Sequence, residues 1–196
     1  MSDFTVVKAV SDTLFQVLVD GITNNPDPQL NGVAIDLRSP KEMRQANNAS
    51  GVSLWLYRIT RDADMLNDRP ERISSSQIRR AALPVHLYYL VTPLVPHAGD
   101  RQTLIGRVLQ LFNDHAILRG ADLQDSLVGS TDEFRVTLET LSLEELTRVW
   151  FSLSEPYDLS VSYEVQVVKI DSDSEAIQGA SVISRKTGYT QIVGVS

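Results

Sequence analysis

The chain of 196 residues contains no cysteine. Disulfide frameworks, thiolate zinc sites and cysteine nucleophiles are therefore excluded, and the chain is compatible with a reducing compartment. There are only three histidines, and His86, His97 and His115 do not match the spacing of any known metal-ligand motif. The sequence therefore predicts a protein without a bound metal or cofactor.

Positive charge is scarce relative to negative charge. The 18 lysines and arginines face 25 aspartates and glutamates, which gives a formal net charge of -7. Binding to nucleic-acid backbones needs basic side chains gathered on one face, so we expect no nucleic-acid partner. No apolar run approaches the roughly 20 residues that span a bilayer, and the first residues lack the basic and apolar blocks of a secretory signal. We therefore expect synthesis and assembly in the cytoplasm, without direct membrane insertion.

Sequence motifs of catalysis are missing as well. No serine stands in a G-x-S-x-G turn, and no glycine cluster resembles a phosphate-binding loop. The neighbouring acids Glu144 and Glu145 fall in the first turn of a predicted helix, where the helix dipole stabilises negative charge. The sequence predicts a non-enzymatic protein with no catalytic residue. An enzyme or small-ligand protein with an unrecognised pocket is the alternative.

The apolar residues that are present predict three helices in a single folded domain. A length of 196 residues with 42% hydrophobic content is enough to bury a core. Apolar side chains recur every third or fourth position over residues 6–22 and 104–112, as expected of helices that bury one face. Ser142 and Glu145 form a capping box that predicts the start of a third helix, which buries Leu143, Leu146, Val149, Trp150 and Leu153.

Alternating apolar residues predict strands over 33–37, 52–60, 83–92, 134–138 and 159–170. The second and third are apolar on both faces and are expected to be central in a sheet. The last alternates with polar residues, which is typical of a half-exposed antiparallel strand. Together these elements predict an α+β fold: a mostly antiparallel or mixed sheet, helices packed mainly on one side, and a C-terminal extension.

Two polar segments interrupt this pattern. Residues 41–50, which include the Asn48-Ala49-Ser50 sequence, are expected to form a loop. Residues 62–80 predict a long mobile excursion that is either disordered or a contact surface that becomes ordered on assembly. Its arginines alternate with acids, so a solvated loop is the simplest interpretation, and a polar contact with a neighbouring subunit is the functional alternative. The candidate contact residues are Arg61, Arg69, Arg72, Arg79 and Arg80.

The composition changes after Asp171. We expect one domain over residues 1–171 and a C-terminal arm or hairpin over residues 172–196. The hypothesis is that apolar residues of this arm pair with an exposed sheet edge of a neighbouring subunit. The alternative is that the arm completes the sheet of its own subunit. The candidate contact residues are Val182, Ile183, Tyr189, Ile192 and Val193.

Three blocks of the sequence resemble a known family. They are residues 52–59 followed by Asn67-Asp68-Arg69-Pro70, residues 83–92 followed by the 104–112 helix, and residues 141–165. In this order the blocks resemble the cap, or tube-terminator, proteins of extracellular contractile injection systems of the antifeeding-prophage type, which are phage-tail-like particles. The resemblance covers most of residues 4–171.

The resemblance implies a structural cap without catalysis or cofactor. Members of the family are expected to form a six-membered ring at the distal end of the inner tube and to anchor the last sheath layer. The implied partners are other copies of the chain, inner-tube subunits and sheath subunits. The final location would be that of the particle, whether released or intracellular. The runner-up interpretation is another tail-completion or baseplate adaptor subunit of the same kind of particle.

Overall fold

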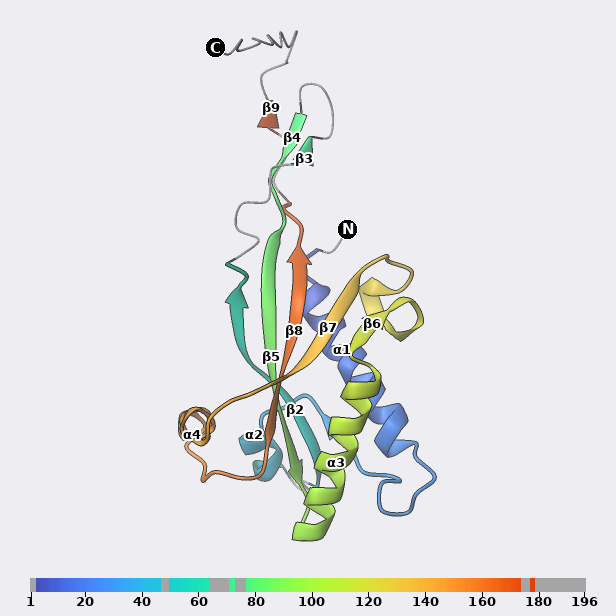
Figure 1. Ribbon diagram of the computed structural model, residues 1–196, viewed down its shortest axis with the longest axis vertical. Helices are drawn as coiled ribbons and strands as arrows, with labels where there is room; N and C mark the ends of the chain where they lie inside the picture. The colour runs from blue at the N-terminus through green and yellow to red at the C-terminus, as the bar shows by residue number, and fades with distance from the viewer. Residues whose placement is uncertain (1–2, 47–49, 64–70, 73–76, 174–176, 179–196) are drawn as a thin grey trace, which may run out of the picture.

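The computed structural model describes residues 3–46, 50–63, 71–72, 77–173 and 177–178. Within them it contains four α-helices and two sheets (Figure 1). The α-helices are α1 (Val6–Leu18), α2 (Pro40–Gln45), α3 (Ala98–Asp114) and α4 (Leu143–Ser152). A π-helical turn (Val19–Thr23) extends α1, and short 3-10 turns occupy Gly120–Asp122 and Asp125–Leu127.

The main sheet has six strands in the order β1-β2-β5-β8-β7-β6. Only the β1–β2 pair is parallel, so the sheet is mixed and mostly antiparallel. The α+β fold predicted from the sequence is confirmed. The strands are β1 (Ile35–Asp36), β2 (Gly51–Arg61), β5 (Leu83–Leu94), β6 (Ile117–Arg119), β7 (Glu133–Glu139) and β8 (Val161–Ile170).

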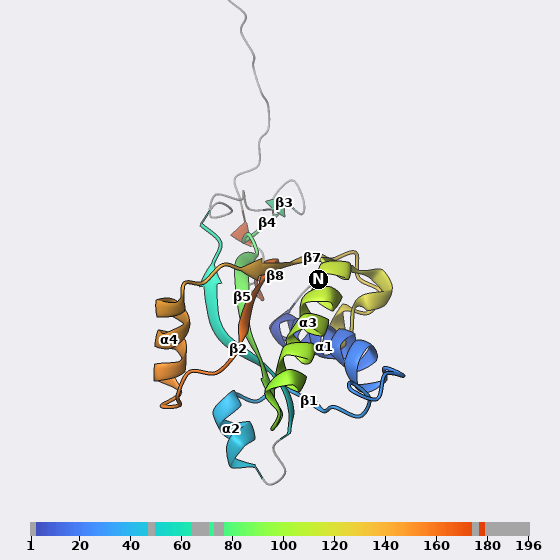
Figure 2. The same cartoon turned by 60° about the horizontal axis from the view of Figure 1, so that its bottom comes forward.

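The two longest helices cover one face of this sheet (Figure 2). The apolar stripe of α1 is buried against the strands, as its periodicity predicts. At the π-helical end of α1, a Cβ atom on Gly21 would collide with the side chain of Leu111 in α3, so glycine allows this close approach. The main core thus lies between the α1–α3 layer and the sheet.

The opposite face of the sheet is covered in part by α4. The predicted capping box is present: the Ser142 hydroxyl accepts a hydrogen bond from the Glu145 N–H, and the Glu145 carboxylate accepts one from the Ser142 N–H. Trp150 and Leu153 pack with Leu90 in a second, smaller core. The prediction that the helix also buries Leu143 is wrong, since this side chain is 66% exposed.

The structure corrects the expected loop over residues 41–50. Pro40–Gln45 form α2, because Ser39 and Glu42 make a second capping box and Pro40 occupies the first helical turn. Strand β6 was also not predicted, because three residues are too few to display an alternating pattern.

Strand β2 is central only at its beginning. It pairs with β5 over its whole length, but β1 covers its other edge only at Val52 and Ser53. The register shifts between Leu56 and Arg58, so the alternation expected over residues 52–60 breaks there and Ile59 is exposed. By contrast, β5 lies between β2 and β8 as predicted.

The end of β5 differs from the prediction. Pro93 does not terminate the strand, which continues to Leu94. Pairing with β8 has ended by this point, since the last β5–β8 pair is Val91 with Val161. Among the described strands, Pro93 therefore neighbours only β2. Proline is tolerated where one side of a strand has no ladder to complete.

Strand β8 pairs antiparallel with β5 and β7, as predicted. Its polar face is less exposed than expected, because Ser160 and Ser162 are buried. Ser160 accepts a hydrogen bond from the Trp150 indole of α4. A register shift against β5 also places Val168 in the core, a position that simple alternation does not predict.

A small second sheet lies beyond one end of the main sheet (Figure 1). It joins β3 (Glu71–Arg72), β4 (Gln77–Arg79) and β9 (Ile177–Gln178), with Ile78 opposite Ile177. The segment 62–80, predicted as a loop, therefore contains two strands. Within the arm predicted from residue 172, Ile177 and Gln178 pair with β4 of the same chain, and the role of the arm remains a prediction.

Candidate subunit-contact surfaces

The three histidines lie in different places. His86 belongs to β5, whereas His97 and His115 flank α3 at its two ends. Within the described part of the chain, no group of three or more histidine, aspartate or glutamate residues could hold a metal ion. No described helix is long and apolar enough to cross a membrane.

The arginines predicted as contact residues are spread along the second sheet and its approaches. Arg61 ends β2 and Arg80 follows β4, and both are exposed. Arg72 pairs with Ile78, and Arg79 with Glu71, in the β3–β4 ladder. Arg69 lies outside the described residues, as do the arm positions Val182, Ile183, Tyr189, Ile192 and Val193. A contact role for all ten remains a prediction.

One group of polar side chains lies on the sheet face that α4 partly covers. It connects neighbouring strands, and Glu139 is at its centre. Its carboxylate accepts hydrogen bonds from Tyr57 at 3.0 Å, Ser162 at 2.6 Å and Arg58 at 2.6 Å. The Arg58 guanidinium also lies 3.8 Å from the ring centroid of Tyr88. Burial raises the pKa of Tyr57 to about 12, so its hydroxyl keeps its proton and donates at neutral pH.

A second group lies further along the same face, around Glu164. The carboxylate accepts hydrogen bonds from Tyr88 at 2.8 Å and Gln166 at 2.8 Å, and it lies 2.6 Å from Nδ1 of His86. The other ring nitrogen of His86 lies 3.1 Å from Asp62. Burial alone would raise the pKa of Glu164, but these hydrogen bonds outweigh burial and hold the pKa below its usual range.

The charged side chains of these two groups already have partners within the chain. Arg58 already contacts a carboxylate and two rings, and Glu139 and Glu164 each accept several hydrogen bonds. A partner protein would gain little from polar groups that are already paired. The network therefore adds side-chain contacts to the backbone ladders that join β2, β5, β8 and β7. Exposed apolar side chains are the better candidates for contact with a partner.

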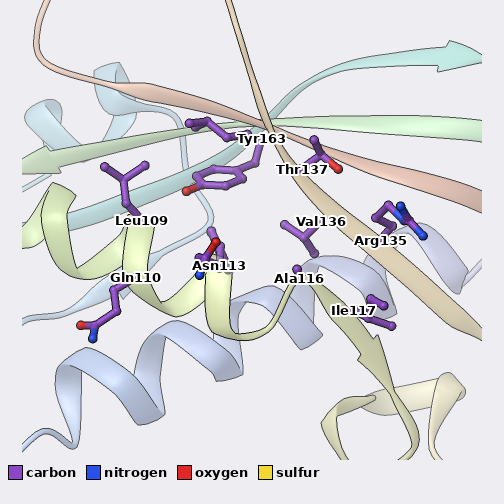
Figure 3. Close-up of a pocket in the computed structure, with 11 residues that line it drawn as sticks. Leu109, Gln110, Asn113, Ala116, Ile117, Arg135, Val136, Thr137 and Tyr163 are labelled. Carbon is purple, nitrogen blue, oxygen red and sulfur yellow. The ribbon is translucent and has the colours of Figure 1, made fainter.

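The first apolar surface is a pocket of about 740 Å³ between α3 and β7, which we call the α3–β7 pocket (Figure 3). It forms where the core layer ends: Phe134 and Val136 of β7 are buried, whereas Leu138 on the same face is 49% exposed. Arg135 makes no ion pair with any described residue. The pocket is lined by Leu109, Gln110, Phe112, Asn113, Ala116, Ile117, Arg135, Val136, Thr137, Leu138 and Tyr163.

The second apolar surface is the exposed apolar part of α4, which we call the α4 ridge and define by Leu143 and Phe151. These side chains are 66% and 83% exposed. Eight residues rotate a helix by two turns plus about 80°, so Phe151 points away from the sheet, whereas Leu143 lies on the side of Trp150 and is exposed because it stands at the start of the helix. A helix that is apolar on two sides is typical of one packed between two partners.

The α4 ridge is held firmly in place. Arg44 of α2 donates to Glu155 at 2.7 Å and to Asp158 at 2.8 Å, on the segment that returns from α4 to the sheet. Arg101 of α3 also donates to Asp158, at 3.0 Å. The Arg44 guanidinium lies 5.4 Å from the ring centroid of Trp150. These contacts are partly screened from water and fix the helix before any partner binds.

Sequence comparison identifies the family. Residues 9–183 match the family model described as the Pvc16 N-terminal domain, which covers most of the chain. The chain belongs to the Pvc16 N-terminal domain family. The family resemblance noted from the three sequence blocks is thereby confirmed. No curated protein matches the chain.

Two solved structures share the fold of this Pvc16-type domain. One is described as the sheath/tube terminator of PVC, an extracellular contractile injection system, in its extended state. It has 17% identity and a TM-score of 0.63, over 99% of this chain and 67% of that one. The other, the anti-feeding prophage tube terminating cap, has 19% identity and a TM-score of 0.60, over 92% of this chain and 60% of that one. The Pvc16-type chain thus spans about two thirds of the length of these relatives.

The sequence patterns did not reveal the α3–β7 pocket or the exposure of the α4 ridge. The one available signal was the composition of residues 143–153, where Phe151 is an apolar side chain outside the stripe that was predicted to face the sheet. The pocket has no comparable signal, because it depends on where α3 ends relative to β7.

Proposed function

We propose that this chain is a structural, non-enzymatic cap that terminates the tube and sheath of an extracellular contractile injection system. The family match over residues 9–183 carries this proposal. The fold shared with a sheath/tube terminator and with a tube terminating cap supports it. The same two descriptions favour a cap over a baseplate adaptor, which would lie at the other end of the particle.

The proposed partners are further copies of the chain in a ring of six, the last inner-tube subunits and the last sheath layer. A ring requires that each copy use two different surfaces, one for each neighbour. The α4 ridge and the α3–β7 pocket are two such surfaces on one chain, separated by the sheet (Figure 2). This arrangement supports a ring without fixing its number of copies.

The proposed contacts with tube or sheath involve the second sheet and the residues that follow it. Removing residues 179–196 keeps β9 paired with β4 and keeps all of the main sheet. The truncated chain keeps every helix and strand that the structure describes, so it should still fold, and it should lose attachment to sheath. Full attachment after this truncation would remove Val182, Ile183, Tyr189, Ile192 and Val193 from the contact surface.

The experiment that tests the function is localisation of the chain on purified particles. A short peptide tag placed after residue 196 is labelled with gold-conjugated antibody and imaged by negative-stain electron microscopy. The proposal predicts label at the end of the particle opposite the baseplate. Label at the baseplate would support the adaptor interpretation, and unlabelled particles would contradict both.

A further inference from the structure

We infer that the α4 ridge of one copy of this chain inserts into the α3–β7 pocket of a second copy. The inference deepens the proposed ring and relies on the proposed function for ring closure. The contact itself depends only on two surfaces of the described chain. One surface is convex and apolar, and the other is a concave pocket with apolar walls.

The two surfaces match in shape and in apolar character. Phe151 is almost entirely exposed, although it belongs to a helix that ion pairs and a buried tryptophan hold in place. The pocket volume of about 740 Å³ exceeds what a single aromatic ring fills, so it can accept a helical turn with its neighbours. Leu138 lines the pocket. Leu109 and the ring of Tyr163 line it as well (Figure 3).

Charge also favours this pairing. Arg135 lies at the pocket, is exposed, and forms no ion pair with the described residues. The first turn of α4, next to Leu143, carries Glu144 and Glu145. Docking of the ridge brings Glu144 toward the Arg135 guanidinium, which would donate directed hydrogen bonds to this carboxylate in exchange for its solvent-exposed pair with Arg148. Opposite charges around an apolar centre are the usual arrangement of a specific interface.

The positions of the two surfaces determine the type of assembly. In both views α4 lies across the sheet from α3 (Figures 1 and 2). Because the ridge and the pocket are different surfaces, the contact is head-to-tail rather than two-fold symmetric. Repetition of such a contact gives a closed ring or an open filament.

Cysteine cross-linking tests the contact directly, because the natural chain has no cysteine. Phe151→Cys and Asn113→Cys change exposed positions, one on the ridge and one on the pocket wall. We expect a disulfide-linked dimer when the two single variants are mixed and oxidised, and none from either variant alone. The double variant should give a ladder of cross-linked species that ends at the size of the ring. Val128→Cys, which is also exposed (67%) but lies outside both surfaces, is the matched control and should not cross-link with Asn113→Cys.

Cross-linking is measured both on the free protein and on purified particles that carry the variants. Self-linking of Phe151→Cys, or no 151–113 link in particles that contain the chain, would overturn the inference and leave the cap function intact. If the free protein forms the 151–113 link but the chain is never found in particles, the contact would be supported and the cap function would be contradicted. Phe151→Ala should weaken self-association about tenfold or more, as expected for an aromatic anchor, whereas Phe4→Ala should not.

Discussion

At the scale of single residues, Gly51 shows how tightly β1 and β2 are joined. Its φ angle is +157°, and a Cβ atom there would lie against the backbone oxygen of Ala34. That same oxygen accepts the hydrogen bond of the Val52 N–H at 2.8 Å. A side chain at position 51 therefore cannot be accommodated without displacing the only parallel pair of the main sheet.

Gly51→Ala should lower the free energy of unfolding by about 1–3 kcal/mol, the usual cost of a strained backbone position. Gly106→Ala is the matched control, since a Cβ atom at Gly106 of α3 meets no atom within 4 Å. The control should raise stability by up to about 1 kcal/mol, because alanine favours helix more than glycine does. Urea denaturation measures both. Equal effects of the two substitutions would contradict the role given to Gly51.

Glu164 gives a prediction about pH. Its pKa in the folded chain lies below the usual glutamate value, so the ionised carboxylate stabilises the fold at neutral pH. This contribution is complete above the unfolded pKa and is lost as the pH falls through the lowered folded pKa. Acid should therefore destabilise the natural chain more than it destabilises Glu164→Gln.

The measurement is the urea midpoint of both proteins from neutral pH to about pH 3, where protonation of carboxylates dominates stability. The gap between the two midpoints should be largest at neutral pH and should narrow toward pH 3. Glu144→Gln, which removes an exposed carboxylate whose ion pair with Arg148 is open to solvent, should show little gap at any pH. A constant gap for Glu164→Gln would exclude the ionised carboxylate as its source.

At the scale of elements, Trp150 is the largest buried side chain that attaches α4 to the sheet. Trp150 is fully buried, donates a hydrogen bond to Ser160 at 3.1 Å and packs against Leu90. Trp150→Ala should lower the free energy of unfolding by about 3–5 kcal/mol, as truncation of a buried aromatic side chain does.

The neighbouring Phe151→Ala should change stability by less than about 0.5 kcal/mol, since that side chain faces solvent. Thermal unfolding of the two variants separates the roles of the inner and outer sides of α4. A large loss of stability in Phe151→Ala would mean that the ridge belongs to the folding core, and it would weaken its assignment as a contact surface.

The elements also show which features can be predicted from sequence. The start of α4 was predictable because its capping box is a local pattern of four residues. The helix α2 has the same Ser39 to Glu42 pattern, but six residues hold too few turns for an apolar period to appear. The bulges in β2 and β8 were not predictable, because an extra residue in a ladder depends on the partner strand.

The two candidate contact surfaces were harder to predict from the sequence than the fold was. Exposure of Phe151 follows from the position of α4 at the rim of the sheet, and the α3–β7 pocket follows from the point where α3 ends. Both are relations between elements distant in the sequence. The family, by contrast, was identifiable from three sequence blocks, because these contain core strands and a capped helix whose order defines the fold.

At the scale of the whole molecule, the chain combines a polar network that is hydrogen-bonded within the chain with apolar side chains that are exposed to solvent. Glu139 and Glu164 on the sheet face accept hydrogen bonds within the chain, whereas the α4 ridge and the α3–β7 pocket leave apolar side chains exposed. This distribution is typical of a subunit that functions by assembly. It agrees with a cap, which must bind the tube end, contact sheath and offer no surface on which another tube layer can grow.

Tube length in particles that lack this chain is the most direct test of that function. Particles are assembled with the gene intact, with the gene deleted, and with the deletion complemented by the natural chain. Their tube lengths are then measured by negative-stain electron microscopy. The cap function predicts tubes of widely varying length, or unstable sheaths, in the deletion alone, with uniform length restored by the natural chain. Uniform, capped particles without the chain would contradict it.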